Sequence, residues 1–353
     1  MSKSKEESRL LNSLGTDILS AEERTCDIKA FCQSLPEYMR GKIDSHVIND
    51  SLKDYHVHYR RLTDHIVQYY RDHCALSTKV TSVYYKTIEI NLQIKKINDD
   101  EIAIYVPEKW ANFFRDTLAL LCTMHEDWND HEQLGNIYTA LLVYIDGFYR
   151  RGWGASVGSR ETVDKCIRVL EGHFTEISDL LFSIFAYAIC HELSHIVLEH
   201  DKQNISVIER ETEADTHAYI MFLKLIQNYL QGNDQEIAIT ECFQHYVANA
   251  PQILLRLYAT IHSYLSTVHE EKRLQEYPDF LLREKTLFDL QKNMPIEKWL
   301  SLCEKIDTTT LFNQDAMQFY KKIQESCEYF VEQTILKKQR GKLDVLKKLD
   351  SEE

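Results

Sequence analysis

The stretch that decides the fold covers residues 180–200 and reads LLFSIFAYAICHELSHIVLEH. Its first eleven residues are apolar apart from one serine, and they run straight into the segment HELSH. An apolar run of this length is too short to cross the hydrocarbon core of a bilayer, which takes about 20 residues. The pattern predicts a buried helix from about residue 176 to residue 203, with Thr175 as its N-cap and Asn204 as a left-handed C-terminal cap.

The 353-residue chain has the composition of an ordinary globular protein, with 44% apolar and 27% charged residues. Only ten glycines and five prolines interrupt it, which favours helices over most of its length. Its formal net charge is −14. Because proteins that bind the backbone of nucleic acids generally carry excess positive charge, we expect no nucleic-acid partner.

The cysteines and the N-terminal segment predict a cellular compartment. The nine cysteines include no CxxC pair and have irregular spacing, which argues against a disulfide framework and favours a reducing environment. The first residues, MSKSKEESRLLNSL, are charged and lack the apolar centre of a signal peptide. We therefore expect a cytoplasmic protein without a membrane span.

One segment predicts β structure. Residues 87–95, TIEINLQIK, alternate between apolar and polar side chains, as expected for a half-buried strand. Residues 98–100 form a turn signal, and apolar residues alternate again over residues 102–106. The pattern predicts a β-hairpin, with helical periodicity resuming from Glu108.

These signals predict a mainly α protein with a small β-hairpin or sheet, an α+β class in which the strands are few. We divide the chain into a helical N-terminal region over residues 1–76, a central core over residues 77–232 and a helical C-terminal region over residues 233–353.

The chemistry is concentrated in His191, Glu192 and His195, which form an HExxH motif. Residues four apart lie on one face of a helix, so both imidazoles can point at one ion. Zinc accepts neutral imidazole nitrogens at about 2.0–2.1 Å and leaves room for a water molecule. Glu192, beside the first imidazole, can then take a proton from that water.

A second helix is predicted to follow the first, from about residue 207 to residue 230. Ser206 and Glu209 form a capping box at its start, in which each side chain satisfies a free backbone N–H of the other. A turn near Asn204 would let the two helices pack antiparallel.

Glu211 and Asp215 lie four residues apart on this second helix, so both can face the HExxH helix. We expect Glu211 to be the third zinc ligand and Asp215 to accept the N–H of His191, which would fix the tautomer of that ring. Glu213 is the alternative third ligand. Asp201 is a further alternative, six residues after His195.

The segments HELSH and ERETEADTHA, at residues 191–195 and 209–218, resemble the gluzincin metallopeptidases, whose signature is HExxH with a downstream ExxxD. They are also similar to the Lit-like phage-exclusion peptidases of bacteria. The resemblance covers about residues 191–217. It implies a zincin-like core, zinc-dependent hydrolysis of peptide bonds, and a regulated protease of an anti-phage defence type.

A further similarity lies in YPDFLLR, residues 277–283. Several relatives carry an HP-x4-R segment after the second metal helix, and this chain has Tyr277 in place of the histidine. A tyrosine hydroxyl can donate to an oxyanion, so Tyr277 is a candidate catalytic residue.

The expected mechanism is general-base hydrolysis. His191, His195 and Glu211 would hold Zn²⁺, and Glu192 would move the proton from water to the leaving amine. The partners would be a protein or peptide substrate, lying extended along the hairpin over residues 87–106, and a protein activator.

Two other functions remain open. One is a metal-stabilised but inactive scaffold that binds a protein. The other is a metal phosphohydrolase, for which His200 and Asp201 would supply an HD pair.

Overall fold

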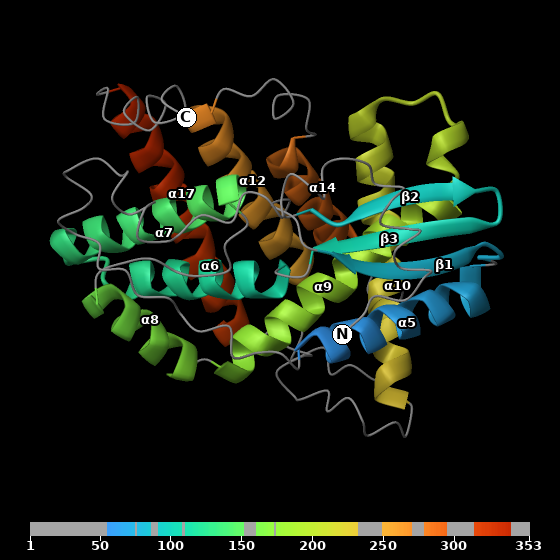
Figure 1. Cartoon of the computed structure of the whole chain (residues 1–353), viewed down its shortest axis with the longest axis horizontal. Helices are drawn as coiled ribbons and strands as arrows, with labels where there is room; N and C mark the ends of the chain where they lie inside the picture. The colour runs from blue at the N-terminus through green and yellow to red at the C-terminus, as the bar shows by residue number, and fades with distance from the viewer. Residues whose placement is uncertain are drawn as a thin grey trace.

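The computed structural model describes residues 55–74, 76–85, 91–107, 110–151, 160–172, 174–231, 249–269, 279–294 and 314–339. These residues are mostly helical, with one small sheet at one end of the molecule (Figure 1). The predicted class, mainly α with a small β element, is confirmed.

The described part of the chain forms the following helices in sequence order. They are α5 (Tyr55–Cys74), α6 (Trp110–Glu126), α7 (His131–Arg151), α8 (Arg160–Gly172), α9 (Phe174–Val197), the short 3₁₀ helix η1 (His200–Lys202), α10 (Val207–Gln231), α12 (Ala250–His269), α14 (Phe280–Asn293) and α17 (Gln314–Gln339).

The sheet has three strands in the order β1-β3-β2. The strands β2 (Gln93–Asn98) and β3 (Glu101–Pro107) pair antiparallel, which confirms the hairpin, although residues 87–90 lie outside the described residues. The strand β1 (Lys79–Tyr85) pairs parallel to β3 and was not predicted, because KVTSVYY does not alternate between apolar and polar residues. Among the described strands, β1 and β2 are therefore the two edge strands.

The helix α9 is the central element of the described core. Its residues from Leu180 to Cys190 are buried apart from Phe182, and it packs against α5, α6, α10 and α12. By length and composition alone, the span Ile177–Val197 is apolar enough to cross a membrane, but 67% of the tested window is buried inside the protein. The predicted buried helix is thus observed.

The ends of α9 differ from the prediction. Thr175 falls inside the helix rather than at its N-cap, and the helix stops at Val197 rather than near residue 203. Glu199, with φ of 53°, takes the left-handed conformation assigned to Asn204. The early stop lets the chain turn so that His200 is buried beneath the helix end.

The helix α10 begins as the sequence predicts. The backbone N–H of Ser206 donates to Glu209 Oε2 at 2.9 Å, and the backbone N–H of Glu209 donates to Ser206 Oγ at 3.3 Å. This reciprocal pair is the predicted capping box.

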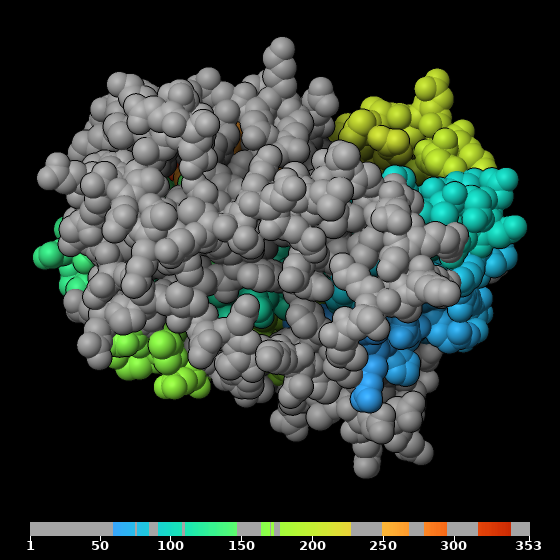
Figure 2. Space-filling view, in the orientation of Figure 1, coloured from blue at the N-terminus to red at the C-terminus, as the bar shows by residue number. Residues whose placement is uncertain are grey.

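One connected cluster of buried apolar side chains joins the described elements, from Tyr59 on α5 to Phe330 on α17. Described parts of all three predicted regions contribute to it, and the three-part division stays a prediction. In the space-filling view, the hairpin and the turn after α9 lie side by side at one end of the molecule (Figure 2).

Candidate active site

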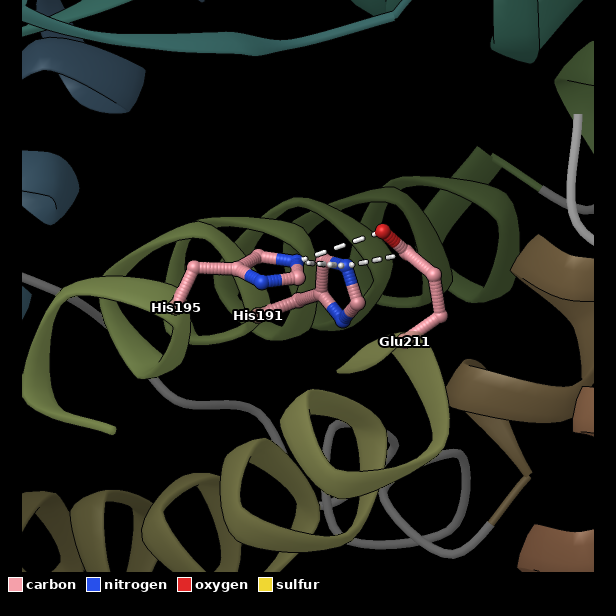
Figure 3. A group of neighbouring side chains, drawn as sticks. All are labelled: His191, His195 and Glu211. Carbon is pink, nitrogen blue, oxygen red and sulfur yellow. Dashed lines mark hydrogen bonds and ion pairs between the residues drawn. The ribbon is translucent and has the colours of Figure 1, made fainter. Parts of the chain in front are cut away.

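The structure brings His191, His195 and Glu211 together. The two histidines lie one turn apart on the same face of α9, and Glu211 reaches them from the first part of α10, which packs against α9 (Figure 3). One donor atom from each residue lies within 4.8 Å of the other two. Among the described residues, this is the group of histidine, cysteine and acidic side chains that could hold a metal ion.

The spacing of the donor atoms suits a tetrahedral ion. His191 Nε2 lies 3.1 Å from His195 Nε2 and 3.2 Å from Glu211 Oε2, and His195 Nε2 lies 3.6 Å from Glu211 Oε1. Bonds of about 2.0–2.1 Å to a tetrahedral zinc ion would separate its ligands by about 3.3 Å. The observed separations of 3.1, 3.2 and 3.6 Å are close to this value, and the two histidines face different oxygens of the Glu211 carboxylate.

Asp215 lies next to His191, and the predicted hydrogen bond between them is not formed. Its Oδ1 is 2.9 Å from His191 Nδ1, close but not aligned as a hydrogen bond, and it also accepts a hydrogen bond of 2.8 Å from Tyr187 Oη. Asp215 is 1% exposed. A carboxylate at this position can orient the imidazole so that Nε2 faces the site.

Arg283, on α14, is a site residue that the sequence analysis did not single out. Its Nε and Nη2 donate to the two carboxylate oxygens of Asp215 at 2.6 and 2.8 Å, and its Nη1 lies 3.0 Å from Glu211 Oε2. It is 5% exposed. One guanidinium thus holds both α10 carboxylates, which lie 68 and 72 residues earlier in the chain. The sequence did contain a signal for this residue, because Arg283 is the final arginine of the segment YPDFLLR.

The charges at the site call for a cation. Glu192, Glu211 and Asp215 supply three carboxylates, and Arg283 supplies one positive charge. With both histidines neutral, a divalent ion would bring the sum to zero, and in the metal-free site a proton on His191 supplies part of this balance.

The protonation of the metal-free site follows from the same contacts. Burial would lower the pKa of His191, but the Asp215 and Glu211 carboxylates outweigh it and raise this pKa to about 10. Burial and the neighbouring His191 charge lower the pKa of His195 to about 3. Burial, opposed by the charge of His191, raises the pKa of Glu192 to about 7. A carboxyl group with that pKa can exchange protons near neutral pH.

Glu211 itself stays ionised. Burial would raise its pKa, but the contacts with His191 and the Arg283 guanidinium lower it to about 2. The pKa of Asp215 is also held well below its usual range, because Arg283 and His191 outweigh the effect of burial.

The alternative third ligands lie elsewhere. Glu213 contacts His200, with 3.3 Å between Oε2 and Nε2, and Asp201 is exposed on η1. Neither belongs to the group of donors described above. His200 Nδ1 lies 2.8 Å from His195 Nδ1, and His200 and Asp201 do not appear together in a group of donors that could hold a metal ion among the described residues. Tyr277 lies outside the described residues, and its catalytic role stays a prediction.

A cleft of about 720 Å³ opens above the two histidines. The edge strand β2 lies along one side, and α12 and α14 contribute an apolar wall on another. Its lining includes His191, Glu192 and His195 together with Leu254, Tyr258 and Phe280. The cleft can therefore admit an extended peptide beside the site.

The helix α5 packs against α9 and supports the turn that carries the motif. Tyr70 Oη, fully buried, donates to the backbone carbonyl of Cys190 at 2.9 Å and lies 3.2 Å from Ser194 Oγ. Ser194 also lies 2.9 Å from His217 Nδ1 on α10. These contacts anchor the turn of α9 that carries the motif.

The sequence model of the family described as Peptidase U49 matches residues 153–264, which include both α9 and α10. No curated protein and no solved structure matches the chain. The family match supports a peptidase function, and therefore a hydrolase, for this protein.

Proposed function

We propose that this protein is a zinc-dependent endopeptidase. The observation that carries the proposal is the convergence of His191 Nε2, His195 Nε2 and a Glu211 carboxylate oxygen beside Glu192, in a cleft with a strand along its edge. The match to Peptidase U49 over this part of the chain supports the same class of reaction.

Zinc suits the donor set better than other common ions do. Two imidazoles and one carboxylate are the His₂Glu ligands of catalytic zinc sites, whereas Mg²⁺ and Ca²⁺ prefer oxygen ligands. When bound, zinc would supply a Lewis acid that polarises the peptide carbonyl and acidifies a water molecule.

The chain's own residues supply the proton transfers and the alignment. Glu192 takes the proton of the attacking water and delivers it to the leaving amine, for which its raised pKa is suited. Asp215 orients His191, and Arg283 holds the carboxylates of Glu211 and Asp215 in place.

The substrate is proposed to lie extended along β2. Among the described strands, β2 pairs with β3 alone, so its other edge could offer backbone groups to a peptide, and its residues Gln93 and Ile94 line the cleft. Such pairing would hold a peptide across the site without requiring a particular sequence.

We also propose that the protease is cytoplasmic, acts on a protein substrate under the control of a protein activator, and serves an anti-phage type of defence. The resemblance of HELSH and ERETEADTHA to the Lit-like peptidases supports the defence role, and the composition supports the compartment. A protease of this kind must be restrained until it is needed.

The test compares the proteomes of cells that express the native chain and the Glu192→Gln variant. We expect new protein termini with the native chain only, while the purified variant keeps its zinc and its fold. Glu171→Gln, the same change at an exposed position on α8, serves as the matched control and should cleave as the native chain does.

Full activity in Glu192→Gln would overturn the proposal. Bound zinc without Glu192-dependent cleavage would instead favour the inactive scaffold. Release of phosphate from nucleotides, with Mn²⁺ or Fe as the bound metal, would favour the phosphohydrolase.

A further inference from the structure

The turn after α9 places a third histidine against the site. The left-handed conformation of Glu199 reverses the chain directly after the helix, and the next residue, His200, is 3% exposed. The His195 and His200 rings lie with centroids 4.9 Å apart and planes at 69°. A buried polar ring at this position needs partners for both of its nitrogens.

Both nitrogens of His200 have such partners. Nδ1 lies 2.8 Å from His195 Nδ1, and Nε2 lies 3.3 Å from Glu213 Oε2 on α10. A chain of three side chains therefore leads from the site to the surface, where Glu213 is 55% exposed.

The donor and acceptor groups of these three side chains determine where their hydrogens lie. The carboxylate of Glu213 can only accept, so His200 Nε2 carries a hydrogen and, in a neutral ring, His200 Nδ1 is an acceptor. His195 Nδ1 must then carry the hydrogen between the two rings. The lone pair of His195 is thereby left on Nε2, the atom that faces His191 and Glu211.

We propose that His200 and Glu213 are positioning residues that fix the tautomer and the ring orientation of His195 for metal binding. The inference rests on the proposed zinc site and extends it. His195 is thus backed by a second imidazole, whereas His191 has the carboxylate of Asp215 2.9 Å from its Nδ1.

Substitutions at His200 separate positioning from packing. His200→Leu fills similar space but has no acceptor, whereas His200→Asn keeps an oxygen near the former Nδ1. We expect His200→Leu to weaken zinc binding by about 10- to 100-fold, as loss of such supporting partners generally does. His200→Asn should recover most of this loss.

The measurement is a competition titration of purified, metal-free protein with Zn²⁺ against a chromophoric chelator. Glu213→Ala should weaken binding less than His200→Leu, because its carboxylate is exposed and water can replace it. His131→Leu, at an exposed histidine at the start of α7, is the matched control and should bind zinc as the native chain does. Unchanged affinity in a folded His200→Leu variant, or no recovery in His200→Asn, would overturn the proposal.

A second measurement needs no variant. Nitrogen-15 NMR of the histidine rings in the native chain, with and without zinc, should place the His195 hydrogen on Nδ1, with a coupling to His200 Nδ1. A hydrogen on His195 Nε2 would overturn the proposal even if the His200 variants fail to fold. If the native chain binds no zinc, the proposed function fails, while the metal-free spectrum still decides the tautomer.

Discussion

Arg283 shows how much one side chain can contribute to this site. Its guanidinium is buried and contacts the carboxylates of both Asp215 and Glu211. Burial alone would lower the pKa of Arg283, but these carboxylates outweigh it and raise this pKa well above its ordinary value. The positive charge is therefore retained at neutral pH.

Removing this charge would leave two carboxylates without their partner. We expect Arg283→Gln to lower the free energy of unfolding by about 3–5 kcal/mol, the usual cost of breaking a buried pair, and to weaken zinc binding. Arg283→Lys should lose less, because it keeps the charge but not the paired hydrogen bonds. Urea unfolding of the metal-free proteins measures the difference.

Arg168→Gln, at an exposed position on α8, is the control for this substitution. A change of less than about 1 kcal/mol in Arg283→Gln would show that the Arg283 contacts contribute little to stability, since surface substitutions are usually that small.

At the scale of elements, α14 connects the site to the C-terminal helices. Arg283 faces α10, whereas the adjacent Glu284 binds Arg256 on α12 at 2.7 Å and accepts a hydrogen bond of 2.6 Å from Tyr320 on α17. Two neighbouring residues of opposite charge thus attach α14 to three other helices. The position of the site therefore depends on helices that contribute no predicted ligand.

The start of α10 offers a test of local stability. Ser206→Ala removes the hydroxyl that caps the backbone N–H of Glu209, and we expect the free energy of unfolding to fall by about 0.5–2 kcal/mol. Zinc affinity should fall little, because Glu211 is held separately by Arg283. Thermal unfolding followed by circular dichroism gives the stability.

Ser206→Asp should restore most of this loss, since aspartate caps well and also favours a helix N-terminus. A Ser206→Ala variant as stable as the native chain would show that the capping box is not needed for α10.

At the scale of the whole molecule, the predicted metal would stabilise the folded state. A ligand that binds only the folded state stabilises it, by about 4 kcal/mol when its concentration is 1,000 times its dissociation constant. A chelator should therefore lower the melting temperature of the zinc-loaded protein. Metal-free protein should melt at the same temperature with or without the chelator.

The sign of the pH dependence follows from His191. Its pKa is raised to about 10 in the metal-free protein, so at pH 7 zinc must displace a proton that is still bound. Zinc affinity should rise as pH rises from 6 to 8, with release of at least about one proton per ion. Calorimetric titrations in two buffers of different ionisation enthalpy measure this release, and a proton count near zero would contradict it.

Local patterns in the sequence were enough for several features. The spacing of His191 and His195, the capping box at Ser206 and Glu209, and the alternation over residues 102–106 each depend on neighbours within a few residues. Helical and strand geometry convert such spacings directly into shared faces. The buried helix, the second helix and the hairpin could all be predicted for this reason.

Only the tertiary structure decided the rest. Pairing of β1 with β3, the contact of Arg283 with Glu211, and the placement of His200 behind His195 depend on how separate elements pack. The burial of His200 also required α9 to end at Val197. No residue near Val197 predicted that end. Contacts between segments that are far apart in the sequence depend on how the whole core packs. A single sequence does not show which of these segments lie close together.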